Sequence, residues 1–180
     1  MQPTGFDFQQ NYFQLFRLPE SFRLDGARLE QQYHELQTQV HPDRFAHLPE
    51  AERRLSMQWA TRVNEAYQTL RSPIGRARYL LSLRGVDTQE ESNTAMPMDF
   101  LVQQMEWREA MEEARRAQDM GELEQMEARV RQETQALHEL LAARIDDERN
   151  YHAAAEGVRK LKFLEKLEEE IASAFDEIDT

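Results

Sequence analysis

A His-Pro-Asp tripeptide, His41-Pro42-Asp43, lies between two amphipathic segments of the sequence. Pro42 disfavours helical geometry at His41 and has no backbone N–H to donate, so the preceding helix is expected to end there. Asp43 then lies outside the helix, where its carboxylate can accept a bidentate pair of hydrogen bonds from an arginine of another protein. His41 can fix the loop by packing or hydrogen bonding. The pattern predicts a polar binding loop rather than a catalytic pocket.

The enzymatic alternative is a hydrolase that uses Asp43 and His41. Against it, the sequence has no nucleophile elbow and no phosphate-binding glycine loop. His47 follows His41 across a proline-containing loop, and no compact cluster of His, Asp and Glu accompanies it. The chain also has no cysteine, which excludes disulfides and cysteine-ligated zinc or iron–sulfur clusters. We therefore expect a protein without catalytic residues, metal site or cofactor.

The N-terminal half is expected to be helical. Prolines and glycines divide it into segments whose apolar residues recur at helical spacing. Asp25 is a plausible N-cap for the helix before the tripeptide, and Pro73 suits the first turn of another. The expected helices cover residues 11–17, 25–40, 50–70 and 73–83. Those on either side of the tripeptide form an antiparallel hairpin, with core-facing residues that include Leu29, Tyr33, Leu36, Val40, Leu55, Trp59, Val63, Ala66, Tyr67 and Leu70.

The C-terminal half is expected to be a three-helix bundle. Residues 86–97 are polar and lack a periodic apolar face, so we interpret them as a linker. The helices beyond it are expected over residues 98–120, 122–149 and 151–178, with breaks near Gly121 and Asn150. No segment alternates with period two for long enough to be a strand. The predicted class is all-α, with a helical-hairpin domain over residues 1–85, the linker 86–97 and a bundle over 98–180.

Charge is distributed unevenly between the halves. The net charge of the 180-residue chain is −12. Residues 1–84 carry 11 Lys and Arg against 9 Asp and Glu, a net of +2, so residues 85–180 carry −14. Such acidity disfavours nucleic-acid binding and attracts a basic protein partner. No apolar run reaches the length of a membrane span, and the first ten residues lack a base, so we expect a cytoplasmic protein.

The first helix of the bundle is predicted to have two apolar faces. One is a core stripe within about 60° of arc, formed by Phe100, Trp107, Met111 and Ala114. The other, roughly 170° away, combines three apolar residues with three carboxylates: Leu101, Val102, Met105, Glu106, Glu109 and Glu113. A helix packed in a bundle needs one apolar face, so the second is a candidate interface. Phe163 lies about a quarter turn off the last helix's core stripe and is a candidate aromatic anchor.

Four sequence runs carry a family resemblance. Two resemble the J-domain of DnaJ-type co-chaperones: QQYHELQTQVHPDRF (residues 31–45) and RVNEAYQTLRSP (62–73). Two more resemble the HscB-type J-proteins of iron–sulfur cluster assembly: RARYLLSLRG (76–85) and RKLKFLEKL (159–167). The likeness extends from about residue 11 to about residue 171. It implies that the loop of His41, Pro42 and Asp43 engages a DnaK-type chaperone and accelerates its ATP hydrolysis.

The resemblance also implies two partners. The chaperone is expected to be HscA-like and to contact Arg28 and Arg44 in addition to the loop. Glu30 and Glu35 interrupt the basic helix that J-domains usually carry, which favours such a specialised chaperone, and the following helix adds positive charge at Arg53, Arg54 and Arg62. The client is expected to be an IscU-type scaffold protein, bound by residues Leu101, Val102, Met105, Glu106, Glu109, Glu113 and Phe163.

The expected function is therefore that of a co-chaperone that stimulates this chaperone's ATPase and delivers the scaffold to it. One alternative is a J-protein with a different client. Burial of Leu101, Met105 and Phe163 would favour that alternative. The corresponding structural explanation of the second apolar face of residues 98–120 is that Leu101, Val102 and Met105 pack under the linker or against the first domain. A helical structural protein is another alternative, and substitution of Asp43 would then have no effect.

Overall fold

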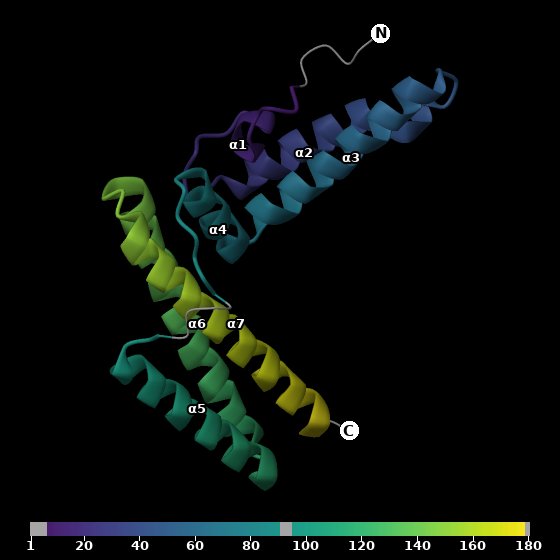
Figure 1. Ribbon diagram of the computed structural model, residues 1–180. Helices are drawn as coiled ribbons and strands as arrows, with labels where there is room; N and C mark the ends of the chain where they lie inside the picture. Colours follow the sequence, from purple (N-terminus) through teal and green to yellow (C-terminus); the bar gives the residue numbers. More distant parts are fainter. Residues whose placement is uncertain (1–6, 91–94, 179–180) are drawn as a thin grey trace. The chain divides into compact units, whose positions relative to one another are not determined.

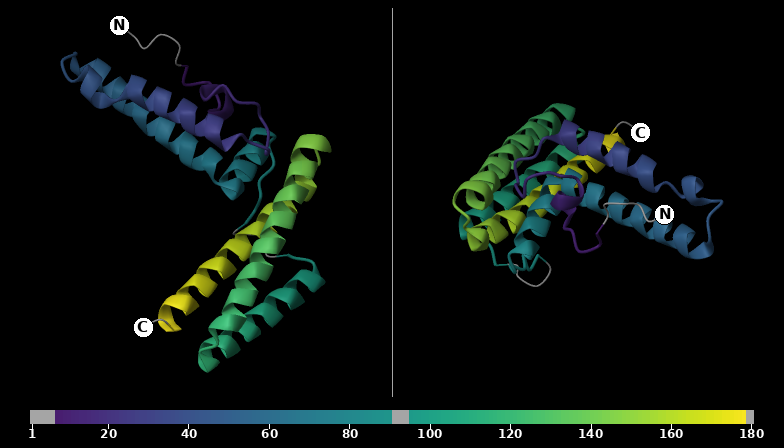
Figure 2. Two further views of the ribbon diagram at one scale, coloured as in Figure 1. Left: turned by 180° about the vertical axis from the view of Figure 1, so that it is seen from behind. Right: turned by 90° about the horizontal axis from the view of Figure 1, so that it is seen from above.

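The computed structural model describes residues 7–90 and 95–178. Every regular element within those ranges is helical, which confirms the predicted all-α class. Contacts between residues divide the chain into two compact units, residues 1–83 and 84–180. Figures 1 and 2 show the helices of each unit.

The first unit is built around a helical hairpin. Its helices are α1 (Tyr12–Leu15), α2 (Gly26–Val40), α3 (Glu50–Arg71) and α4 (Pro73–Leu83). α2 and α3 lie side by side and antiparallel (Figure 1), and α4 packs against α3. The predicted N-cap is confirmed, because the Asp25 side chain accepts a hydrogen bond from the Arg28 backbone N–H at 3.1 Å. The predicted starts of α3 and α4 are also confirmed.

Some of the residues predicted to face the hairpin core are only half-buried. Leu29, Val40, Trp59, Val63 and Leu70 are buried as predicted, whereas Tyr33, Leu36, Leu55 and Tyr67 are half-buried. The rings of Tyr33 and Tyr67 stack on each other at 4.0 Å, and the Tyr33 hydroxyl donates to Asn64 at 2.8 Å. Two packed helices leave their flanks open, so side chains at the edge of the apolar stripe keep access to water.

Residues before α2 are anchored to α3 and α4. The ring of Tyr12 stacks on Tyr79 at 4.4 Å, and the Tyr12 backbone N–H donates to the Tyr79 hydroxyl at 3.0 Å. Burial raises the pKa of Tyr79, so its phenol stays protonated at neutral pH. The Arg62 guanidinium donates to the Gln10 carbonyl at 2.6 Å and lies 5.4 Å from the Tyr12 ring. Arg62 therefore holds the N-terminal segment in addition to contributing charge.

Gly75 should tolerate no side chain, because the start of α4 lies against the end of α3. A Cβ there would lie 2.8 Å from the Thr69 carbonyl oxygen. We expect Gly75→Ala to lower the free energy of unfolding by about 1–3 kcal/mol, since backbone must move to relieve the overlap. Gly26→Ala is the matched control: nothing lies within 4 Å of the point that its Cβ would occupy, and a small gain is expected. Chemical denaturation of both variants checks the prediction, and equal effects would contradict it.

The second unit pairs two long helices with a third. Its elements are α5 (Met98–Ala117), α6 (Met120–Ala142), the π-helical turn η2 (Ala143–Asp147) and α7 (Tyr151–Ile178). α6 and α7 make the most extensive contact, and α5 packs on both (Figure 2). The apolar residues that recur at helical spacing on α6 and α7 are buried, except the half-buried Phe175; they are Leu123, Met126, Val130, Leu137 and Leu141 on α6, and Val158, Leu161, Leu164, Leu167 and Ile171 on α7. On α5, Met111 and Ala114 are buried, but Phe100 and Trp107 are half-buried.

The break predicted near Gly121 is confirmed, but it lies at Gln118 and Asp119 and not at the glycine. α5 ends at Ala117, Gln118 takes a left-handed conformation with φ of 53°, and Asp119 caps α6 by accepting from the Glu122 N–H at 3.1 Å. Gly121 lies in the first turn of α6. An aspartate cap and a left-handed glutamine thus replace the glycine that usually ends a helix. The next break, near Asn150, is where α7 begins, and the Asn150 side chain accepts from the Ala153 N–H at 3.2 Å.

The segment interpreted as a linker packs in part on α7. Thr88 is buried, and its carbonyl oxygen accepts a hydrogen bond from the Arg159 guanidinium at 3.1 Å. Residues 91–94, also assigned to the linker, lie outside the described residues. The polar composition of the segment concealed this packing, because the hydrogen bond to α7 is made by the Thr88 backbone and not by a periodic apolar face.

Gln104 on α5 is an internal polar residue that the sequence pattern did not predict. It is 6% exposed, and neither its amide nitrogen nor its amide oxygen has a hydrogen-bond partner among the described residues. Since a buried unpaired polar group carries a desolvation penalty, we expect Gln104→Leu to raise the free energy of unfolding by about 1–3 kcal/mol. Urea denaturation measures this change. Unchanged or reduced stability would contradict the prediction.

Candidate interaction surfaces

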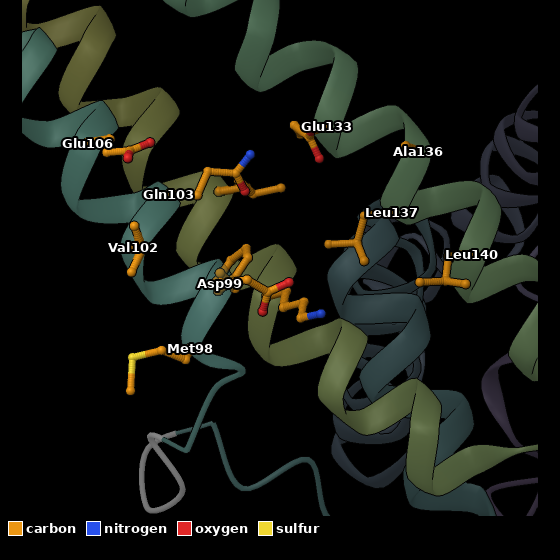
Figure 3. Close-up of a pocket in the computed structure, with 12 residues that line it drawn as sticks. Met98, Asp99, Val102, Gln103, Glu106, Glu133, Ala136, Leu137 and Leu140 are labelled. Atoms are coloured by element: carbon orange, nitrogen blue, oxygen red, sulfur yellow. The ribbon is translucent and has the colours of Figure 1, made fainter.

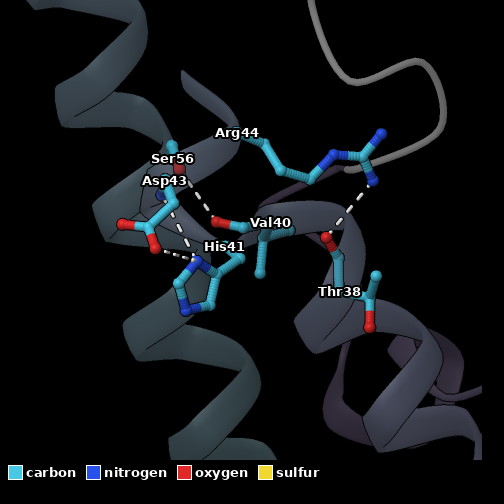
Figure 4. A network of polar contacts seen from close by, with 6 residues as sticks. All are labelled: Thr38, Val40, His41, Asp43, Arg44 and Ser56. Atoms are coloured by element: carbon cyan, nitrogen blue, oxygen red, sulfur yellow. Dashed lines mark hydrogen bonds and ion pairs between the residues drawn. The ribbon is translucent and has the colours of Figure 1, made fainter. Parts of the chain in front are cut away.

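The loop between α2 and α3 is held by hydrogen bonds that replace the missing helical ones (Figure 4). Pro42 begins the short 3-10 helix η1 (Pro42–Phe45) and supplies no N–H for the Thr38 carbonyl, its partner in a continued α-helix. The Arg44 guanidinium donates to that carbonyl at 3.2 Å instead. Behind the loop, the buried Ser56 hydroxyl on α3 donates to the Val40 carbonyl at 2.8 Å. The end of α2 is thereby fixed from two sides.

His41 fixes the loop from within, as its position predicts. Its Nδ1 accepts a hydrogen bond from the Asp43 backbone N–H at 3.3 Å, and it lies 3.7 Å from the Asp43 carboxylate (Figure 4). One nitrogen cannot accept from the N–H and donate to the carboxylate together, and acceptance requires the unprotonated ring nitrogen. The side chain of Asp43 is 92% exposed. The arrangement presents a carboxylate on a constrained backbone.

The residues predicted to bind the chaperone lie at two places. His41, Pro42, Asp43 and Arg44 are together in the loop and are exposed. Arg28 is exposed near the start of α2, about 18 Å away along the helix axis, where its guanidinium donates to the Arg17 carbonyl at 3.4 Å. A partner that contacts Arg28 and the loop together must therefore span the length of α2.

The basic residues of α3 differ in whether their side chains already contact other groups of the protein. Arg54 pairs with Glu50 at 2.7 Å one turn earlier, and Arg62 is half-buried against the N-terminal segment. Arg53 is exposed beside them. On α2, Glu30 and Glu35 are also exposed. The hairpin surface is therefore mixed in charge, in agreement with the departure from strongly basic J-domains noted in the sequence.

The second apolar face of α5 reaches solvent. Met105 is 64% exposed and Val102 46%, while Leu101 is half-buried. The three carboxylates predicted to accompany them, Glu106, Glu109 and Glu113, are exposed on the same helix. Burial of Leu101 and Met105 would have favoured a different client, and neither residue is buried. The α5 face is thus an open surface, apolar toward the start of the helix and acidic along its length.

Phe163 on α7 adjoins this helix. It is half-buried, and its ring lies edge-on to Phe100 of α5 at 6.2 Å. Charged residues border the pocket of about 430 Å³ beside it: Glu90, Arg159, Lys162, Glu165, Lys166 and Glu169. The contact with Phe100 therefore holds the Phe163 ring at the surface, as the position of Phe163 off the core stripe predicted.

Two exposed apolar residues of this unit were not predicted from the sequence. Met98, the first residue of α5, is 74% exposed, and Leu140 on α6 is 38% exposed. Both line a groove that also includes Val102 and Glu106 (Figure 3). Leu140 precedes the buried Leu141 in the sequence. Because successive residues are about 100° apart around a helix, the place of Leu141 on the core stripe indicates that Leu140 lies off that stripe.

The described residues hold neither a membrane-spanning helix nor a cluster of metal ligands. Among residues 7–90 and 95–178, no helix is long and apolar enough to cross a membrane. Within the same ranges, no three His, Cys, Asp or Glu side chains gather in an arrangement that would hold a metal ion.

Comparisons with known proteins find relatives that belong to a single family. Residues 96–172 match the family model described as the HSCB C-terminal oligomerisation domain. The chain is 55% identical over 173 residues to a "Co-chaperone protein HscB homolog" of Azoarcus sp. (strain BH72), covering 96% of this chain and 98% of the relative. It is 51% identical over 168 residues to the homolog of Ralstonia nicotianae, covering 93% and 96%.

Solved structures agree over nearly the whole chain. "Chaperone HscB from Vibrio cholerae" superposes with a TM-score of 0.84 and 37% identity, covering 94% of this chain and 99% of that one. Human co-chaperone protein HscB gives a TM-score of 0.87 and 30% identity, covering 93% and 83%. The family resemblance expected from the sequence runs is confirmed. The chain therefore belongs to the HscB family of co-chaperones, the J-proteins of iron–sulfur cluster assembly.

Proposed function

We propose that this protein acts in the cytoplasm as a non-enzymatic co-chaperone with two partners. Residues 1–85 form a J-domain that stimulates ATP hydrolysis by an HscA-like chaperone of the DnaK type. Residues 98–180, beyond the linker 86–97, bind an IscU-type scaffold protein and deliver it to that chaperone. The hydrolytic chemistry belongs to the chaperone, and the co-chaperone couples hydrolysis to the arrival of the client.

The observation that carries this proposal is the constrained, exposed carboxylate of Asp43. Hydrogen bonds from Arg44 and Ser56 fix the end of α2, and His41 accepts from the Asp43 N–H. The backbone that carries the carboxylate is therefore fixed before a partner arrives, which reduces the entropy lost when an arginine of the chaperone forms a bidentate pair with it. Because this loop sits at the tip of a hairpin, it can enter a recess of a larger protein.

The surface proposed for the scaffold combines the α5 face with Phe163. The exposed Met105 and Val102 supply apolar contact area, and the edge-on pair of Phe163 and Phe100 supplies an aromatic anchor. Carboxylates at Glu106, Glu109 and Glu113 select a partner with basic groups opposite them and orient it. The alternative J-protein function, with a different client, uses the same loop and leaves this surface to another protein.

The experiment that tests the proposal is the steady-state ATPase rate of the HscA-like chaperone from the same organism. The rate is measured alone, with the scaffold, with this protein, and with both. We expect stimulation by this protein that rises further when the scaffold is present, since one protein then contacts the chaperone and its client. Stimulation indifferent to the scaffold would support the alternative client. An absence of stimulation of this chaperone and of the general DnaK would overturn the proposal.

A further inference from the structure

An open groove of about 680 Å³ runs between α5 and α6, with α7 as its floor (Figure 3). It lies in the second unit, where α5 contacts α6 and α7 less extensively than those two contact each other. A volume of this size falls in the range that binding pockets use and exceeds that of one side chain.

The walls of the groove are apolar and accessible. Met98 and Val102 of α5 form one side, and Leu140 of α6 the other. These side chains are 74%, 46% and 38% exposed. Leu137 and Leu164, both buried, continue the apolar surface below them. Three accessible apolar side chains facing one hollow are more than the scattered exposure that ordinary surfaces show.

Carboxylates border the same groove. Asp99 and Glu106 lie on α5, and Glu133 lies on α6 opposite them (Figure 3). The positive charge in the lining is Lys160, whose ammonium pairs with Glu156 at 3.2 Å and lies 5.5 Å from the Phe100 ring centroid. The groove therefore presents an apolar hollow with a negatively charged border.

We propose that this groove extends the scaffold-binding surface and receives an apolar side chain from a positively charged segment of the scaffold. The inference rests on the proposed function. Val102 and Glu106 belong both to the α5 face and to the groove, so a protein seated on the face reaches the groove without a gap. The apolar walls supply contact area, while the bordering carboxylates favour lysine or arginine beside the inserted side chain.

Charge disfavours a second copy of this chain as the occupant. Residues 85–180 carry a net charge of −14, so two copies that meet through this half bring like charges together. A segment of opposite charge has no such penalty. Its affinity should fall as ionic strength rises, because salt screens the attraction between solvent-exposed charges.

The test is titration calorimetry of the purified full-length protein with the IscU-type scaffold. We expect Leu140→Gln and Glu133→Lys each to weaken binding by tenfold or more. Controls are Met57→Gln, which removes an apolar side chain that is 60% exposed on α3, and Glu124→Lys, which reverses an exposed charge on α6 outside the groove. Both controls should bind as the wild type does. Thermal unfolding verifies that each variant is folded.

The outcomes separate this inference from the proposed function. If Met105→Gln weakens binding while Leu140→Gln and Glu133→Lys do not, the groove inference is overturned and the α5 face remains. If none of the three variants weakens binding, the scaffold binds elsewhere, and the groove inference is overturned together with the role of the α5 face. If the wild type does not bind the scaffold at all, the scaffold function itself fails. Sedimentation of the protein without scaffold decides the remaining case: a dimer that Leu140→Gln dissociates would assign the groove to a second copy and overturn the inference.

Discussion

Replacing Asp43 with asparagine should abolish stimulation of the chaperone's ATPase and leave the fold and scaffold binding unchanged. The substitution keeps the size of the side chain and removes its charge. It also keeps the backbone N–H that donates to His41 at 3.3 Å, so the loop retains its geometry. Because the side chain is 92% exposed, we expect a change in unfolding free energy within about 0.5 kcal/mol.

The expected loss is large because the carboxylate is proposed to meet an arginine in a desolvated contact. Truncating one partner of such a charge pair costs on the order of 2–5 kcal/mol, or about 30-fold to several thousand-fold in affinity. A neutral amide offers one acceptor oxygen where the carboxylate offers two, so the bidentate geometry is lost as well. Stimulation should therefore disappear at concentrations where the wild type saturates the chaperone.

Single-turnover ATP hydrolysis by the chaperone, followed with increasing co-chaperone, measures this effect. Glu65→Gln is a matched control, since it removes the charge of an exposed carboxylate on α3 of the same unit. It should stimulate as the wild type does. Scaffold affinity of the Asp43→Asn variant, measured separately, should be unchanged. Full stimulation by Asp43→Asn would refute the role assigned to the loop.

The hairpin and its loop were predictable because their determinants are local. Asp25 caps α2, Pro42 ends it, and Pro73 opens α4, each through a backbone constraint that the residue imposes wherever it occurs. The structural role of His41 followed in outline from its place beside Pro42. Its partner, the N–H of Asp43, became evident only with the three-dimensional arrangement.

The missed features depend on contacts between segments distant in sequence. Arg62 looked like an exposed charge on α3, but the chain before α2 returns to it and offers the Gln10 carbonyl. Thr88 looked like part of a linker, but Arg159, 71 positions later, donates to its carbonyl. The break near Gly121 was predicted from the glycine, but Gln118 and Asp119 end and restart the helices without it, which shows a weakness of composition rules.

The candidate client surface was predictable on α5 and incomplete beyond it. One helix that carries two apolar faces is visible in a single stretch of sequence, so Leu101, Val102 and Met105 could be assigned together. Leu140 could not be joined to them in the same way. Its place opposite Val102 depends on how α6 crosses α5, and periodicity within one helix carries no information about that crossing.

Substituting Met105 with glutamine should weaken scaffold binding about 10- to 100-fold, while ATPase stimulation without scaffold stays at the wild-type level. Met105 is 64% exposed near the middle of the candidate face, so the substitution removes apolar contact without opening a cavity. Glutamine has similar length and helix propensity, which preserves α5. Because glutamine is uncharged, the loss of scaffold affinity cannot be attributed to the added repulsion or attraction that a charged residue would bring.

A second substitution on the same helix separates the apolar contribution to scaffold binding from the electrostatic one. Glu109→Gln should reduce the salt dependence and association rate of scaffold binding more than it changes the dissociation rate, as expected for an exposed charge that steers a basic partner. Met105→Gln should act mainly on dissociation, because apolar packing forms after encounter. Stopped-flow binding at two salt concentrations distinguishes the two. Wild-type kinetics for both variants would mean that the scaffold binds elsewhere, and α5 would then be available to another client.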